Sequence, residues 1–147
     1  MTEPARKPTV NQHTREQLIL AAERLFSESG IDAVSLRQIN VAAGQRNSSA
    51  SHYHFGSKEA LIAAMFEYRM DPINRRRLQR LDEVSKTGQD HNVRLLVQAI
   101  ILPMVEEIEQ SEGGSHYIRC EAQYLRHPRV DFFSLWRSEH SEGIQRI

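Results

Sequence analysis

Two short helical patterns around a glycine, followed at once by a third capped helix, constrain this chain more than any other feature. The segment reads SLRQINVAAGQRNSSASHYHFGSKEAL and covers residues 35–61. Ser35 starts a capping box with the glutamine three positions later, and Gly44 ends that first helix. A short polar helix is expected over about residues 47–53, and Ser57 caps the next helix. A small polar helix held out in this way is typical of a helix that enters a DNA groove.

Helical spacing of apolar residues continues on both sides of this segment. Upstream, the pattern predicts a helix from Thr14 to Gly30, after a polar, proline-containing arm at residues 1–13 that we expect to be flexible. No strand alternation interrupts the patterns, so the chain is predicted to be all-α. Downstream, the predicted helices begin at Ser57, restart at Asp71-Pro72, run over about 92–110 with a kink at Pro103, restart at Ser115 and continue over 130–147.

The length and charge of the chain suit a DNA-contacting module joined to a second unit. The 147 residues carry no formal net charge, and 39% of them are hydrophobic. Residues 1–80 nevertheless hold 12 Lys and Arg against 8 Asp and Glu, whereas residues 81–147 hold 7 against 11. This asymmetry suits a DNA-contacting front part attached to a second unit.

Several protein classes are not favoured by the sequence. No apolar run could cross a bilayer and no signal peptide is present, so a cytoplasmic protein with no membrane partner is expected. Paired carboxylates at catalytic spacing, a phosphate loop and a nucleophile motif are all missing, so neither an enzyme nor a cofactor is expected. His52, His54 and Cys120 lack the spacing of a zinc site, so no metal is expected, and His54 is interpreted as a hinge residue.

Together these motifs resemble the N-terminal domain of the TetR family of bacterial repressors over about residues 14–62. The resemblance implies a helical, usually homodimeric transcription regulator that binds double-stranded DNA and, in many members, is released by a small molecule. It also implies a division of the chain into a flexible arm at 1–13, a helix-turn-helix DNA-binding domain at 14–62 and a helical regulatory domain at 63–147. It depends on the combination of motifs, since each one alone could occur by chance. The matching residues are Arg15-Glu16-x-x-Ile19, Ala21-Ala22-x-x-Leu25-Phe26, Gly30, Ile39 to Gly44, and Tyr53-His54-Phe55-Gly56-Ser57-Lys58-Glu59-x-Leu61.

A small apolar core is predicted to fix the angle at which the third helix protrudes. Taken alone, that helix could be a polar surface helix with no partner, but its place after the glycine turn favours DNA contact. The predicted core residues are Leu18, Ala22, Leu25, Phe26, Val34, Leu36, Ile39 and Phe55. The side chains that the helix would present to base edges or phosphates are Arg46, Asn47, Ser48, Ser49 and His52.

Individual roles in DNA contact follow from side-chain chemistry and from the resemblance. Arg46 is the candidate for reading a guanine, because its planar fork matches two acceptors on that base. Lys58 lies in the first turn of a helix whose positive end suits phosphate, and Ser35 would face phosphate at a helix start as well as capping it. Arg37 is either a DNA contact or a solvated surface residue. By resemblance, His52, Tyr53 and Lys58 lie where the family usually touches the phosphate backbone.

The segment departs from the family pattern in two places. Eight residues separate Gly44 from Tyr53, where the family usually has seven, so one extra residue shifts which side chains face the groove. Ser51 also occupies a position where the family usually has a buried aliphatic residue. Operator specificity therefore does not transfer from the family.

The second half reads mainly as the core of a helical bundle, with a small-molecule pocket as the further hypothesis. The kink expected at Pro103 lies beside aromatic residues and could form one wall of a cavity. The arginines at 75–77 and 80, and Glu106, Glu107 and Glu109, are interpreted as a solvated surface. Predicted core residues here include Leu95, Ile100, Ile101, Phe132 and Phe133, and the pocket candidates are Met104, Tyr117, Cys120, Tyr124 and Trp136.

Two functional hypotheses therefore remain besides an enzyme, which is disfavoured. The first is a ligand-responsive transcriptional repressor, and the second is a DNA-organising protein with the same helix-turn-helix and no inducer. A cavity in the second half would favour the first, and a solid core the second. Family members usually continue through two more helices that pair in the dimer, so we expect either a truncated chain or dimerisation through another surface near Phe132, Phe133 and Trp136.

Overall fold

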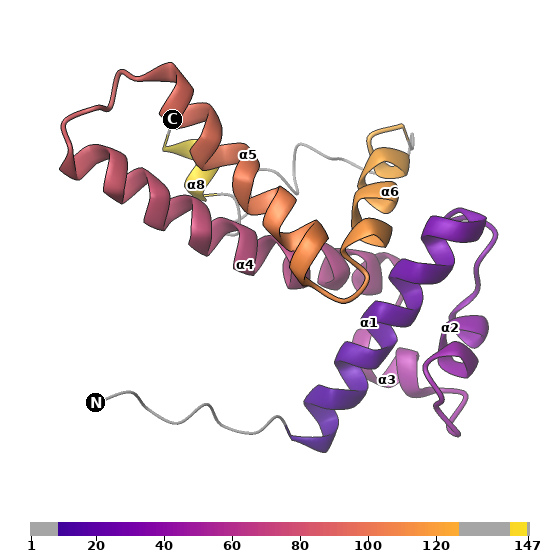
Figure 1. The fold of residues 1–147 in the computed structure, drawn as a ribbon. Coiled ribbons are helices and arrows are strands. Elements are labelled where there is room, and N and C mark those ends of the chain that lie inside the picture. Colours follow the sequence, from indigo (N-terminus) through magenta and orange to yellow (C-terminus); the bar gives the residue numbers. More distant parts are fainter. Residues whose placement is uncertain (1–8, 127–141, 147) are drawn as a thin grey trace.

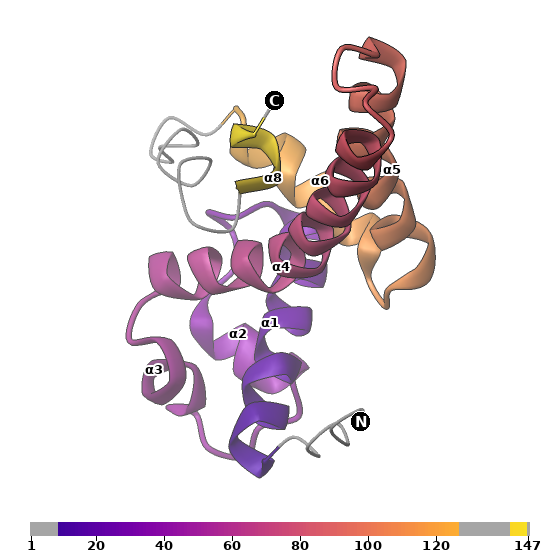
Figure 2. The same ribbon diagram turned by 90° about the vertical axis from the view of Figure 1, so that its left-hand side faces the viewer.

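The computed structural model describes residues 9–126 and 142–146, and within these residues every regular element is a helix. The predicted all-α class is therefore confirmed. Figures 1 and 2 show α1, α2 and α3 gathered at one end of the molecule, with α4 leading from them toward α5 and α8. Helix α6 packs against both α1 and α5. The helices are α1 (Val10–Ser29), α2 (Leu36–Ala42), α3 (Ala50–Phe55), α4 (Lys58–Lys86), α5 (Val93–Gln110), α6 (Gly114–Tyr124) and α8 (Glu142–Gln145).

The first helix, α1, begins four residues earlier than the sequence pattern predicts. Thr9 and Gln12 form a complete capping box, so the helix starts at Val10 instead of Thr14. The expected arm at residues 1–13 is thus wrong for its last four residues, which are helical. Residues 1–8 lie outside the described part of the chain.

Helices α1 to α3 and the start of α4 share one apolar core. The residues at its centre, Leu18, Phe26, Ile39 and Leu61, are completely buried. The predicted core is confirmed, with Leu25, Leu36 and Phe55 half-buried at its margin. This core holds α2 and α3 against α1.

The long helix α4 passes through Pro72 without a break, although the sequence pattern predicts a restart there. Proline removes one backbone donor, and burial of Ile73, Arg77, Leu81 and Val84 downstream offsets that loss. Figure 2 shows that α4 changes direction along its length. The boundary predicted between residues 62 and 63 therefore falls inside one continuous helix.

Helix α5 follows the predicted bounds but buries less of its apolar surface than expected. Asn92 caps it by accepting a hydrogen bond from the Leu95 amide. Ala99, Pro103 and Glu107 are its buried residues, whereas Ile101, predicted in the core, is 48% exposed. The prediction for Ile101 was wrong because α5 turns only one narrow face toward α4.

The next helix, α6, begins at Gly114 rather than being capped by Ser115. Gly114 packs directly against the end of α5, and a Cβ there would lie 2.4 Å from the carbonyl oxygen of Glu107. Residues 127–141 lie outside the described part of the chain, and so do the predictions made for Phe132, Phe133 and Trp136.

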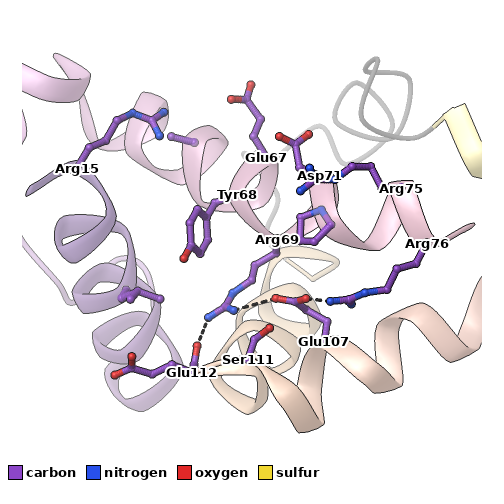
Figure 3. Close-up of a pocket in the computed structure, with 13 residues that line it drawn as sticks. Arg15, Glu67, Tyr68, Arg69, Asp71, Arg75, Arg76, Glu107, Ser111 and Glu112 are labelled. Atoms are coloured by element: carbon purple, nitrogen blue, oxygen red, sulfur yellow. Dashed lines mark hydrogen bonds and ion pairs between the residues drawn. The ribbon is translucent and has the colours of Figure 1, made fainter. Parts of the chain in front are cut away.

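A buried ionic cluster links α1, α4 and α5, and we call Arg69, Glu23 and Glu107 the ionic joint. Arg69 donates to both carboxylate oxygens of Glu23, at 3.0 and 2.7 Å, and to Glu107 at 3.0 Å. It also donates to the Glu112 carbonyl at 2.5 Å (Figure 3). All three members of the joint are at most 3% exposed. Glu107 was predicted on the surface, and the structure shows that this was wrong.

The two carboxylates of the ionic joint shift their pKa values in opposite directions. Burial raises the pKa of Glu23 and outweighs its hydrogen bond to Arg69. Burial acts in the same sense on Glu107, but hydrogen bonds from Ser111, Arg69 and Arg76 outweigh it and lower the pKa of Glu107. Glu107 is therefore the firmly ionised partner of Arg69.

The arginines of the 75–80 stretch also differ from the predicted solvated face. Arg77 is 2% exposed and donates to the Ile100 carbonyl at 3.1 Å. Arg76 pairs with Glu107 at 3.2 Å, and Arg80 pairs with Glu106. Only Arg75 of these four is exposed. Figure 3 shows Arg75 and Arg76 beside an open groove of about 540 Å³ next to the ionic joint.

Candidate nucleic-acid interface

Helix α2 begins as the sequence predicts. The Ser35 hydroxyl oxygen accepts from the Gln38 amide at 3.3 Å, and the Gln38 side chain accepts from the Ser35 amide at 2.8 Å. This capping box is confirmed. Ser35 and Arg37 are both exposed at the start of α2.

The turn between α2 and α3 is longer than predicted. The expected helix over residues 47–53 instead runs from Ala50 to Phe55. The Asn47 side chain accepts from the Ser49 amide at 3.0 Å and from the Ser49 hydroxyl at 2.6 Å. Such short side-chain-to-backbone bonds compete with helix formation, so the chain turns here and the helix starts later. Gly44, with φ +67°, makes the first bend of the turn.

The predicted DNA contacts consequently divide between the turn and the helix. Six of them are exposed between residues 46 and 53, on either side of buried Ala50 and Ser51, and we call this set the exposed edge. Four of the six precede α3 and two lie on its first turns. The members of the exposed edge are Arg46, Asn47, Ser48, Ser49, His52 and Tyr53.

Asn40, which the sequence analysis did not single out, lies directly behind the exposed edge. It is 1% exposed, and its amide group bonds to two backbone groups near the start of α3. The signal for it was present in the sequence, because Asn40 interrupts the apolar stripe of Leu36, Ile39 and Ala43 at helical spacing. An amide inside such a stripe requires polar partners.

Ser51, noted as a departure from the family pattern, is buried beside Asn40. It is 1% exposed, and within the described residues its hydroxyl has no hydrogen-bond partner. The small side chain at this position leaves its backbone amide close to Asn40, at 2.9 Å from the Asn40 side-chain oxygen.

Lys58 is turned toward the protein in this structure. Its ammonium group donates to the Ile31 carbonyl and lies 5.6 Å from the centre of the Phe26 ring. Ser57 caps α4 by accepting from the Ala60 amide at 3.1 Å, as predicted. Lys58 thus ties the start of α4 to the segment before α2, and a phosphate contact by Lys58 stays a prediction.

The end of α3 carries three aromatic side chains: Tyr53 is exposed, whereas His54 and Phe55 are half-buried. Tyr53 is 78% exposed, and its ring meets that of His54 edge to face at 5.2 Å. Burial and the nearby Arg15 charge lower the pKa of His54, so its ring stays neutral near pH 7. Arg15 lies over the Phe55 ring at 5.2 Å and holds the end of α3 to α1.

Two other kinds of site were tested on the described residues. No group of three or more His, Cys, Asp or Glu among them could hold a metal ion. None of their helices has the length and apolar character needed to cross a membrane.

Comparison with known proteins agrees with this geometry. The family model described as bacterial regulatory proteins, tetR family, matches residues 18–65, from α1 into α4. Over these residues the chain is similar to the TetR family. The HTH-type transcriptional repressor KstR2 of Rhodococcus jostii strain RHA1 is 26% identical over 151 aligned positions, which cover 97% of this chain and 71% of that protein. The chain is accordingly a DNA-binding transcriptional regulator.

Four of the five pocket candidates fall in the described part of the chain, and they lie within its core or against it. Tyr117 and Cys120 are completely buried, Tyr124 is 1% exposed, and Met104 packs against the same cluster. The Cys120 thiol donates to the Glu23 carbonyl at 3.2 Å, and burial raises the pKa of this thiol to about 12. Cys120 is therefore a neutral core thiol.

Proposed function

We propose that this protein is a homodimeric repressor that binds a near-palindromic operator and leaves it when a small molecule binds the regulatory helices. The observation that carries the proposal is the exposed edge, a row of polar side chains in front of a fully buried core. Its position at α3, the second helix of the helix-turn-helix, supports insertion into the major groove of DNA.

Within the exposed edge we assign distinct tasks to three side chains. Arg46 reads a guanine through its planar fork, whereas His52 and Tyr53 hold the phosphate backbone. Asn47, Ser48 and Ser49 contact base edges or sugar–phosphate from the turn. Ser35 and Arg37 face phosphates from the start of α2, and Lys58 does so only if its ammonium leaves the Ile31 carbonyl.

Repression is the form of regulation that the comparisons support. The relative that aligns with nearly the whole chain is named a repressor, and this favours repression over the alternative of a DNA-organising protein. We therefore assign residues 14–62 to operator binding and residues 63–147 to regulation.

Selection of bound fragments from random duplex DNA tests the operator. We expect an inverted repeat with half-sites about one helical turn apart or a multiple of it, bound by two copies of the chain. Affinity should fall steeply as salt rises, because Lys and Arg contacts displace counterions. Measuring the mass of the complex checks the dimer. Failure to enrich any sequence, or an enriched site bound by one copy, would contradict this part of the proposal.

An arginine far from the exposed edge serves as a control that distinguishes direct DNA contact from non-specific charge attraction. Arg94 is exposed at the start of α5, and Figure 1 shows the start of α5 at the opposite end of the molecule from α3. Replacement of Arg94 by alanine should leave operator affinity and its salt dependence unchanged. A loss equal to that seen at the exposed edge would mean that binding is non-specific charge attraction.

A substitution at Tyr124 tests whether a small-molecule inducer binds among the regulatory helices. Its hydroxyl is buried and, among the described residues, has no hydrogen-bond partner, which supports a polar group of the ligand beside it. A small-molecule thermal-shift screen should find compounds that raise Tm and release the operator. Tyr124→Phe should weaken that response while preserving the fold, and an unchanged response would place the inducer elsewhere.

A further inference from the structure

Asn40 connects α2 to the beginning of α3 with both ends of its amide group. Its nitrogen donates to the Ser48 carbonyl at 2.5 Å, and its oxygen accepts from the Ser51 amide at 2.9 Å. Because one partner is a carbonyl and the other an N–H group, only one orientation of the amide satisfies both. The Asn40 backbone carbonyl also accepts from the Gln45 amide at 2.9 Å, so one residue holds the turn at three points.

The hydrogen bond from the Ser51 amide to the Asn40 side chain caps the start of α3, although Asn40 belongs to α2. Ser49 is the N-cap residue of α3, and its own side chain makes no capping bond. Its hydroxyl is instead used by Asn47. The Ser51 amide is the second N–H of the helix, one of the groups that a helix cannot satisfy internally. Asn40 satisfies it across the turn.

Helix α3 depends on such external bonds for its position. It has only six residues, far fewer than an isolated helix needs to be stable in water. Four members of the exposed edge lie in the turn before it, where no regular helical bonding fixes them. The path of the turn between Ser48 and Ser51 therefore sets where these side chains point.

We propose that Asn40 is the positioning residue for sequence recognition: it fixes the register of the exposed edge without touching DNA. The inference rests on the proposed DNA binding. It predicts a specific defect, since a displaced edge still presents its charges to phosphates but no longer matches base edges. Loss of Asn40 should thus lower discrimination between operator and unrelated DNA more than it lowers general DNA affinity.

Substitution of Asn40 tests this with two variants and one control. Asn40→Ala removes both side-chain bonds, whereas Asn40→Asp keeps the acceptor for the Ser51 amide and loses the donor to the Ser48 carbonyl. Ser51→Ala is the matched control, because it alters the neighbouring buried side chain and keeps its backbone N–H. The dissociation constants are measured for the selected operator and for a scrambled duplex of equal length, at one salt concentration, with helical content followed by circular dichroism.

We expect the ratio of scrambled to operator Kd to fall about tenfold or more in Asn40→Ala, the scale of losing one base contact. In Asn40→Asp it should fall at least as far, because a buried carboxylate oxygen would face the Ser48 carbonyl oxygen. The scrambled duplex should bind all variants nearly alike, and Ser51→Ala should keep the wild-type ratio. An unchanged ratio in folded Asn40→Ala would overturn the inference. Loss of helical signal in both Asn40 variants would also overturn it, by assigning Asn40 to the fold as a whole. A wild-type protein that does not discriminate between the two duplexes would instead refute the proposed function.

Discussion

The exposed edge and the ionic joint each contain an arginine, but the two arginines have different roles. At the edge, Arg46 is exposed and surrounded by short polar side chains that are available to a ligand. In the joint, Arg69 is 2% exposed and its donors are used by Glu23, Glu107 and the Glu112 carbonyl. Burial thus decides whether an arginine serves a partner or the protein itself.

This difference changes how the charge distribution should be understood. The sequence places an excess of basic residues in its first 80 positions, and several of them lie on α4. Arg69, Arg76 and Arg80 pair with carboxylates of the chain, and Arg77 bonds to a backbone carbonyl. These four arginines are therefore engaged within the chain, and the net count of basic residues overstates the charge left for DNA.

The largest effect is expected from breaking the joint. Arg69→Met keeps most of the side-chain volume but removes the ion-pair partner of buried Glu23 and leaves Glu107 with Arg76. Removing one partner of a buried ion pair costs about 3–5 kcal/mol, which we expect as a lower free energy of unfolding in urea. Arg75→Met, on the same helix but exposed, should change it by less than about 0.5 kcal/mol. Equal stabilities of the two variants would show that the joint contributes nothing.

A second change tests the close contact that brings α6 to the joint. In Gly114→Ala the new Cβ would lie 2.4 Å from the Glu107 carbonyl oxygen and 2.6 Å from the Ile108 Cα, so backbone must move. Overpacking of this kind costs about 1–3 kcal/mol. Thermal unfolding should show the loss, whereas exposed Ser115→Ala serves as control. A wild-type Tm for Gly114→Ala would mean that α5 and α6 separate freely.

A substitution at the exposed edge should change the free energy of operator binding by a similar amount, but leave the free energy of unfolding unchanged. Arg46→Ala should weaken operator binding by about 1–3 kcal/mol, because one bidentate base contact is lost. Tm should stay within error, since Arg46 is exposed. Fluorescence anisotropy with operator and scrambled duplexes measures the change. An equal loss on both duplexes would reassign Arg46 to the phosphate backbone.

The smallest expected effect is a change in how the free energy of unfolding depends on pH in the acid range. The pKa of Glu107 is lowered from 4.5 by its hydrogen bonds, so the stability that it contributes is present above pH 4.5 and is lost as pH falls through its folded-state pKa. Stability measured between about pH 6 and pH 3 should therefore fall less steeply in Glu107→Gln than in the wild type. The exposed Glu109→Gln is the control and should keep the wild-type slope. Parallel curves for all three proteins would remove Glu107 from the acid response.

The sequence by itself determined the helices that begin with a capping side chain. Ser35, Ser57 and Asn92 each bond to an amide three residues later, a contact made within one turn of chain. The apolar spacing around Leu18 and Ile39 likewise determined the core of the N-terminal unit. These features are local, so they are readable without knowing which segments meet.

Only the tertiary structure decided the rest, because it depends on partners that lie far away in the chain. The path of α4 through Pro72, the burial of Glu107 and the inward turn of Lys58 each require a segment at least 20 residues distant. The start of α3 depends on Asn40, whose amide finds its partners 8 and 11 residues later. A buried polar group is stable only where such partners converge, and sequence spacing alone does not show where that happens.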